Sequence, residues 1–187
     1  MALSDADYHE AAVTLGLETA VIKAFATVES NGAGMLPTGE PKILFERHVF
    51  YKRLKAKGIN PDLAPPDICS PATGGYVGGQ AEHKRLARAV AIDRDAALES
   101  ASWGSFQIMG YHWKALGYPS LQSFINDMYA GERGQIKAFV KFIQINPNIL
   151  SALKRKDWAA AARGYNGVDF AKNRYDQKLK QAYEAYA

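Results

Sequence analysis

The chain has 187 residues, of which 48% are hydrophobic and 22% are charged, and its formal net charge is +4. This length fits one domain with a sizeable core, the composition excludes a disordered chain, and the charge permits polyanionic partners without identifying one. A single cysteine, Cys69, excludes an internal disulfide framework and a multi-cysteine zinc site.

The first predicted element is a helix that begins after residue 4. Ser4 and Asp7 form a variant of the capping box, in which each side chain binds the other residue's backbone N–H. Apolar residues then follow at helical spacing until Gly16, which is typical of a helix end. This segment is acidic and has no long apolar run, so we expect no secretory signal peptide.

A second helix is predicted from about residue 18 to residue 30, with Asn31 and Gly32 ending it. Glu29 follows Phe25 by four residues, so it projects from the edge of the buried face. A glutamate in that place is either an ordinary solvated residue at a helix end or a general acid tuned by partial burial.

Residues 41–51, "PKILFERHVFY", are rich in β-branched and aromatic side chains and are predicted to form a strand or hairpin. Strand alternation would place Glu46 on the same face as Leu44 and His48. Residues 58–79 contain four prolines and five glycines. So long a segment without regular structure is typical of a functional rim or lid.

Helical spacing returns at about residue 80 and continues to the last helix, for which Asp169 is the predicted cap. The elements together predict a mainly α (α+β) protein. Residues 133–156 include six basic residues and no acidic one. Such a stretch is usually the solvated face of a helix, and the alternative is contact with anionic lipid or a phosphate-rich envelope.

Three short segments carry a recognisable order of residues: "VES" at 28–30, "SWGSFQIMG" at 102–110 and "RGYNGVDFA" at 163–171. They resemble the Glu-Ser, Gly-x-x-Gln and Tyr-Asn segments of goose-type lysozymes and soluble lytic transglycosylases, although Gly167 follows Asn166 one residue earlier than in that pattern. Over nearly the whole chain, the sequence more closely resembles the N-acetylmuramidase endolysins of phages and prophages of Gram-negative bacteria.

The resemblance implies a lysozyme-like fold, in which a helical lobe and a small β-containing lobe flank a substrate cleft. It implies a single catalytic domain, residues 1–187, without a separate cell-wall-binding module. The implied reaction is cleavage of the β-1,4 bond between N-acetylmuramic acid and N-acetylglucosamine in peptidoglycan. Such a reaction needs a carboxylic acid that stays protonated near neutral pH, which partial burial favours, and a second carboxylate. We predict Glu29 as the general acid and Glu46 as the assisting carboxylate.

Five further residues are predicted to line the substrate groove: Glu99, Ser105, Gln107, Tyr165 and Asn166. The side-chain amides suit N-acetyl and hydroxyl groups, and the tyrosine offers a stacking face and a hydroxyl. Each assignment has a structural alternative. Glu29 could be a surface residue, Glu46 could form a salt bridge with Arg47 or another cation, and Glu99 fits a structural role better than a direct one.

The mechanism requires no metal or cofactor, and the four histidines lie too far apart in sequence to form a local metal motif. We expect a monomer that binds peptidoglycan glycan strands and no nucleic acid. The resemblance and the missing signal peptide predict a protein that waits in the host cytoplasm and acts in the periplasm after release. Two alternatives stay open: a lytic transglycosylase giving 1,6-anhydromuramoyl products, and a non-catalytic basic amphipathic protein that binds the envelope and disrupts membranes.

Overall fold

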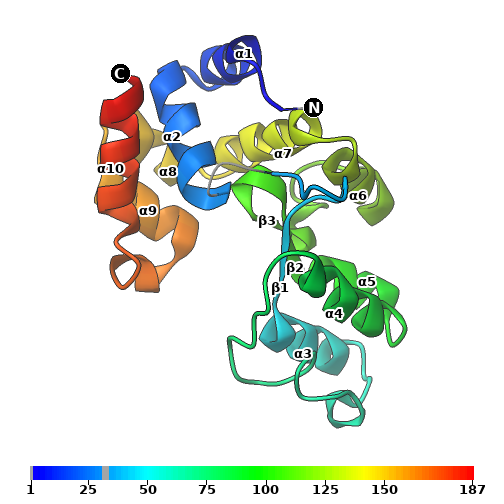
Figure 1. Cartoon of the computed structure of the whole chain (residues 1–187). Coiled ribbons are helices and arrows are strands. Elements are labelled where there is room, and N and C mark those ends of the chain that lie inside the picture. Colours follow the sequence, from blue (N-terminus) through cyan, green and yellow to red (C-terminus); the bar gives the residue numbers. More distant parts are fainter. Residues whose placement is uncertain (1, 31–33) are drawn as a thin grey trace.

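The computed structural model describes residues 2–30 and 34–187, except for the side chains of Ser30 and Asp169. Helices dominate, and one small antiparallel sheet lies among them (Figure 1). The α-helices and strands are α1 (Asp5–Leu15), α2 (Thr19–Ser30), β1 (Ile43–Phe45), α3 (Arg47–Ala56), α4 (Gln80–Val90), α5 (Arg94–Glu99), β2 (Ala101–Trp103), β3 (Ile108–Met109), α6 (Leu121–Tyr129), α7 (Glu132–Gln144), α8 (Pro147–Lys154), α9 (Trp158–Asn166) and α10 (Tyr175–Tyr186). Short 3₁₀ helices are η1 (Pro61–Leu63), η2 (Gly104–Phe106), η3 (Gly110–His112) and η4 (Val168–Ala171).

The first two helices form as predicted. Ser4 and Asp7 make both hydrogen bonds of the capping box, and Gly16 ends α1 in the left-handed conformation with φ of 62°. Helix α2 extends to residue 30, and the predicted stop at Asn31 and Gly32 lies outside the described residues. Phe25 is fully buried, so α2 presents its apolar face to the core.

The strand predicted over residues 41–51 is mostly wrong, because only Ile43–Phe45 is extended and a helix, α3, begins at residue 47. Phe50 and Leu54 lie four residues apart and are both fully buried, which is the spacing of a helix and not of a strand. Glu46 therefore occupies the N-cap position of α3, and the strand alternation that placed it beside His48 does not apply.

The sheet joins distant parts of the chain. Strand β2 pairs with β1 and β3, both antiparallel, and Trp103 lies opposite Ile43 on one side and Ile108 on the other. Strands β2 and β3 belong to the second of the three motif segments. The helical pattern predicted from residue 80 onward is therefore wrong over these two strands. All three residues of β2 are buried, so this short strand has no alternation of apolar and polar residues to reveal it.

The helices form two groups around this sheet. Helix α2 packs against α1 and α10, and α9 packs against α8 and α10, which gives the helical lobe (Figure 1). Helices α3, α4 and α5 pack together with β1 to form the smaller lobe, lower in the same view. Helix α7 carries Phe139, whose ring stacks on Phe106 at 4.3 Å and contacts Phe25 at 5.5 Å. The predicted mainly α fold with a minor sheet is thus confirmed.

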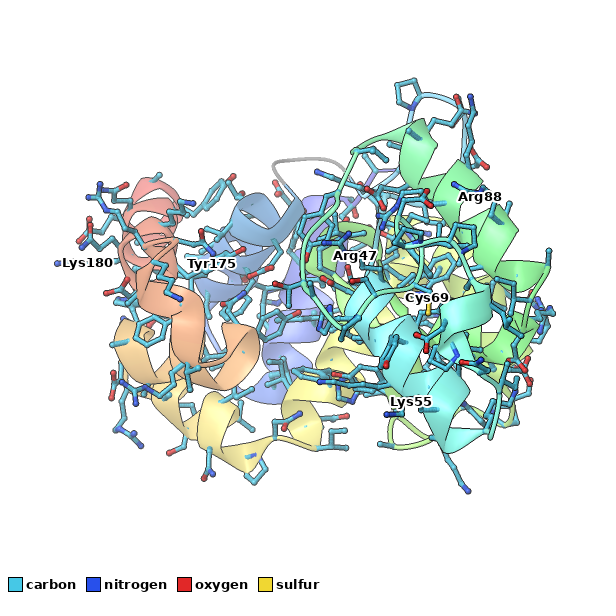
Figure 2. All side chains as sticks on the ribbon, turned by 90° about the horizontal axis from the view of Figure 1, so that it is seen from below. Arg47, Lys55, Cys69, Arg88, Tyr175 and Lys180 are labelled. Carbon is cyan, nitrogen blue, oxygen red and sulfur yellow. The ribbon has the colours of Figure 1, made fainter. Side chains whose placement is uncertain are left out.

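The long Pro/Gly segment after α3 is attached to the small lobe by several charged side chains, among them Arg47, Glu82 and Arg85, the last of which donates to the Asp67 carbonyl. The guanidinium of Arg47, labelled in Figure 2, donates to three backbone carbonyls of the segment, those of Pro66, Ala72 and Thr73. The buried carboxylate of Glu82 accepts the N–H groups of Val77 and Gly78. The segment therefore has a defined path over the small lobe, with one turn of 3₁₀ helix in it.

The C-terminal helix begins later than predicted. Arg174 occupies its N-cap position, whereas Asp169 lies in η4, so the predicted cap is wrong. Across the described residues, no single helix has the length and apolarity to cross a membrane, and only the bent pair formed by α1 and residues 19–29 passes that test jointly.

Candidate active site

Glu29 lies on the last turn of α2, partly buried, and meets the third motif segment. The side-chain amide of Asn166 donates a hydrogen bond of 2.9 Å to Glu29 Oε1. The neighbouring Tyr165 packs its ring edge-on against Phe25 at 5.0 Å and donates its hydroxyl proton to the carbonyl of Phe106 at 2.6 Å. The structure thus brings together the three motif segments that lie far apart in the sequence.

The surroundings of Glu29 favour its protonated form. Burial raises the pKa of its carboxyl from 4.5 to about 7, against the opposing effects of the Asn166 hydrogen bond and the positive charge of Lys178. Burial also raises the pKa values of Tyr165 and Tyr175, and the nearby charge of Glu29 raises both further. In Figure 2, Tyr175 lies on the inner side of the helical lobe, whereas Lys180 projects outward. Glu29 can therefore carry a proton at neutral pH and release it to a bound molecule.

Glu46 belongs to the small lobe, between β1 and α3. Both carboxylate oxygens accept from the hydroxyl of Tyr76, at 3.0 and 2.9 Å, and the side chain is 15% exposed. His48 Nδ1 lies 3.2 Å from Oε2 without forming a hydrogen bond. The alternative salt bridge with Arg47 is not made, because that guanidinium binds backbone carbonyls of the long Pro/Gly segment.

Glu99 links three elements of the structure. It is the last residue of α5, and its carboxylate pairs with Arg53 of α3 and accepts a hydrogen bond of 2.8 Å from the indole N–H of Trp113. Both carboxylate oxygens therefore have partners within the protein. These contacts agree with the structural role that the sequence favoured for Glu99, and contact with substrate stays a prediction.

The second motif segment forms a tight turn between β2 and β3. Gln107 adopts a left-handed conformation with φ of 47°, which is uncommon for a residue with a side chain. Its amide holds the turn, since Nε2 donates to the Gly104 carbonyl at 2.9 Å and Oε1 accepts from Ser102 at 2.8 Å. Ser105 is buried, and its backbone N–H donates to Gln135 at 2.8 Å. The predicted substrate contacts of Gln107 and Ser105 stay predictions.

Gln135 is a site-supporting residue that the sequence analysis missed. It lies on the apolar face of α7 and is 1% exposed. Its Oε1 accepts from the backbone and the side chain of Ser105, and its Nε2 donates to the carbonyls of Gly34 and Met128. One amide thus holds both the β2–β3 turn and the backbone at Gly34. A polar residue within an apolar helical face is the signal that could have identified it.

Away from Glu29 and Glu46, the described residues form a charged groove and no metal site. A groove of about 760 Å³ between α1 and α7 is lined by acidic and basic side chains, including Asp7, Glu10, Arg133 and Lys137, and by none of the predicted site residues. Over residues 2–30 and 34–187, no group of three or more His, Cys, Asp or Glu side chains is arranged to hold a metal ion.

Comparisons with known proteins agree with the sequence resemblance. A family model described as N-acetylmuramidase matches residues 18–187. An endolysin of the Burkholderia phage AP3, known from its crystal structure, shares 46% sequence identity with this chain. The two structures superpose with a TM-score of 0.91, and the alignment covers 98% of this chain and 70% of the endolysin chain. A search of curated proteins gave no significant match. The chain therefore belongs to the N-acetylmuramidase family and is a muramidase, a glycoside hydrolase of peptidoglycan.

Proposed function

We propose that this muramidase cleaves the β-1,4 bond between N-acetylmuramic acid and N-acetylglucosamine, with Glu29 as the general acid. The observation that carries the proposal is the raised pKa of Glu29, about 7, in a partly buried position beside Asn166. A glycosidic oxygen leaves readily only when it is protonated, and an acid that titrates near neutral pH is suited to that step. The Asn166 amide fixes one carboxyl oxygen, so the proton resides on the other.

Glu46 is the second carboxylate of the proposed mechanism. Once the leaving oxygen takes the proton of Glu29, positive charge develops on the sugar ring, and a carboxylate either stabilises that charge or activates the attacking water. A carboxylate has about four lone-pair sites, so the contact with Tyr76 leaves sites for water or sugar. Glu46 belongs to the small lobe and Glu29 to the helical lobe, so the two proposed carboxylates come from different lobes.

Product analysis of two variants tests the proposal. We expect Glu29→Gln to reduce the rate of peptidoglycan digestion by at least about 100-fold, because the amide keeps the shape and lacks the proton. Glu46→Gln should also reduce the rate strongly. Glu10→Gln, the same change at an exposed position of α1, is the matched control and should leave the rate unchanged. Full activity of Glu29→Gln would refute the assignment of the acid.

The same digests separate the two reaction classes. Mass spectrometry should find reducing N-acetylmuramic acid ends, each heavier than the anhydro form by one water. Products with 1,6-anhydromuramoyl ends would instead identify a lytic transglycosylase, in which the sugar's own hydroxyl attacks. Undiminished lysis of outer-membrane-stripped cells by Glu29→Gln would favour the non-catalytic, membrane-disrupting alternative.

Contact of residues 133–156 with anionic envelope or lipid is a second part of the proposal. Lys137, Lys154 and Arg155 are exposed, which supports it. The available charge is smaller than the sequence suggests, because Arg133 pairs with Asp7 and Lys156 pairs with Glu18. Binding of the whole protein to anionic vesicles at low salt, compared with neutral vesicles, tests this contact.

The biological setting is likewise proposed. We infer that the protein is made in the host cytoplasm and reaches the periplasmic face of the cell wall after release, and its similarity to a phage endolysin supports this. We also infer that residues 1–187 act as one catalytic domain and as a monomer. The buried apolar residues form one continuous cluster that includes both lobes, in support of a single folding unit. Fractionation of lysing cells and sedimentation of the purified chain test these two inferences.

A further inference from the structure

The side chain of Glu46 is held by a single hydrogen-bond donor. Glu46 occupies the N-cap position of α3, yet its side chain makes no capping hydrogen bond. Both carboxylate oxygens instead accept from the Tyr76 hydroxyl, at 3.0 and 2.9 Å. Within residues 2–30 and 34–187, no other donor forms a hydrogen bond with this side chain. The carboxylate is therefore bound to the long Pro/Gly segment and not to the start of its own helix.

Local structure alone would favour a different orientation of this carboxylate. The first turn of a helix has backbone N–H groups without partners inside the helix, and its positive end attracts negative charge. Acidic side chains at the N-cap position commonly accept from these N–H groups. At Glu46 this attraction is opposed by a hydroxyl that comes from 30 residues further along the chain. A contact between distant parts of the chain thus decides where the carboxylate lies.

The Tyr76 hydroxyl is suited to fix a carboxylate in one orientation. It lies at nearly the same distance from both oxygens, so a rotation of the carboxylate lengthens at least one of the two contacts. Burial raises the pKa of Tyr76 to about 12, and the hydrogen bond to Glu46 and the charge of Glu46 raise it further in the same direction. Tyr76 therefore keeps its proton at neutral pH and remains a donor.

One buried carboxylate places the tyrosine and Glu46 relative to each other. Glu82 is fully buried, and its Oε1 accepts at 2.6 Å from the N–H of Val77, the residue after Tyr76. Its Oε2 accepts at 3.1 Å from the N–H of Phe45, the residue before Glu46. The donor and the acceptor of the Tyr76–Glu46 contact are thus each one residue away from a backbone group that Glu82 binds.

Glu82 is charged and firmly held. Arg85 pairs with it at 2.8 Å and also donates to the carbonyl of Phe45 at 3.2 Å. Burial alone would raise the pKa of Glu82, but the N–H groups of Val77, Gly78 and Phe45 and the charge of Arg85 outweigh it and hold the pKa below its ordinary value. Breaking a buried ion pair leaves an uncompensated charge, which is strongly unfavourable. The pair therefore holds β1 and the long Pro/Gly segment together.

We propose that Tyr76 is a positioning residue of this muramidase, whose hydroxyl holds the Glu46 carboxylate away from the N-terminus of α3 and in the orientation that the reaction uses. The long Pro/Gly segment is then a fixed support for this hydroxyl. A carboxylate that turned back to the helix would spend its lone pairs on backbone N–H groups and would be less available to the sugar or to water. The inference rests on the proposed function, since it takes Glu46 as the second carboxylate. Tyr76 acts through Glu46 and transfers no proton.

Steady-state kinetics of Tyr76→Phe on soluble peptidoglycan oligosaccharides tests the proposal. This variant of the full chain keeps the ring and removes the hydroxyl. We expect kcat to fall about 10- to 100-fold, the range for one hydrogen bond to a charged group, with little change in KM. Tyr129→Phe is the matched control, at a tyrosine that is 45% exposed on α6, and it should leave both constants unchanged. An unchanged kcat, or a change confined to KM, would refute the positioning role.

A double-mutant cycle separates positioning from a merely structural role. In Glu46→Ala the hydroxyl has no carboxylate to position, so adding Tyr76→Phe should not lower the residual rate further. A structural role would lower the rate by the same factor with and without Glu46. Equal factors in the two backgrounds would therefore overturn the proposal.

The crystal structure of Tyr76→Phe gives a second and independent readout. Without the hydroxyl, the Glu46 carboxylate should turn towards α3 and accept from a backbone N–H of its first turn. A carboxylate that stays in its present position would show that another contact holds it, and the proposal would be wrong even if kcat had fallen.

The outcomes also distinguish this inference from the proposed function. If Glu46→Gln is strongly impaired and Tyr76→Phe is as fast as the unaltered chain, the positioning role is refuted and Glu46 stands as the second carboxylate. If Glu46→Gln is fully active, the assignment of Glu46 itself fails, and the positioning role fails with it. Neither result bears on Glu29 as the general acid.

Discussion

Replacing Glu29 by glutamine should change how the stability of the protein depends on pH. The folded pKa, about 7, lies above the ordinary value of 4.5, so between these values the folded state binds more protons than the unfolded state. Stability from this group is therefore fully present below pH 4.5 and is lost as the pH rises through 7. Each tenfold change in an ionisation constant is worth about 1.4 kcal/mol, so the loss amounts to about 3 kcal/mol.

Urea unfolding of both proteins between pH 4 and 8 measures this effect. The difference in unfolding free energy between the unaltered chain and Glu29→Gln should change by about 3 kcal/mol across that range, in favour of the variant at high pH. For a chain of this size the corresponding shift in melting temperature is about 6–12 °C. Glu10→Gln controls for the loss of one carboxylate at an exposed position. Parallel pH curves for the unaltered chain and Glu29→Gln would mean that Glu29 ionises as it does in water, and the proposed acid would be refuted.

Three further predictions concern the groups around this site. Asn166→Ala should move the basic limb of the pH–rate profile to higher pH, because the Asn166 hydrogen bond lowers the pKa of Glu29; a limb that stays in place contradicts this. Gly104→Ala should lower the free energy of unfolding, measured with urea, by at least about 3 kcal/mol, because its Cβ would lie 2.3 Å from Gln135 Cδ at a φ of +71°. Gly74→Ala is the control: no atom lies within 4 Å of its Cβ, so the free energy of unfolding should fall by only about 1–2 kcal/mol. Gln135→Leu should lower the free energy of unfolding by about 2–4 kcal/mol, since it leaves buried backbone groups without partners. An unchanged free energy of unfolding would contradict the proposed role of this amide.

The sequence predicted those features that depend on local patterns. The capping box at Ser4, the end of α1 at Gly16 and the apolar face of α2 follow from spacing and from turn chemistry. Helix α3 was missed because the β-branched and aromatic residues before it are typical of strands. Its helical spacing becomes visible only when Phe50 and Leu54 are taken together.

The site depends on contacts that no local pattern encodes. Glu29 and Asn166 are separated by 137 residues, and their contact was expected only because three motifs occur in the order known from a family. The Tyr76 hydroxyl at Glu46 and the Gln135 amide at the β2–β3 turn had no such motif. Both are polar contacts set by the packing of separate elements, which one sequence does not reveal.

The Gln135 amide also makes the site observable by hydrogen exchange. The N–H of Ser105 can exchange with deuterated solvent only when its bond to Gln135 opens, and that opening releases a side chain that also holds the Gly34 carbonyl. The exchange rate at one backbone position thus reports opening at two places, the β2–β3 turn and the backbone at Gly34. A ligand that bridges the lobes should slow deuterium uptake at Ser105, because it disfavours the opening that breaks the Ser105–Gln135 bond.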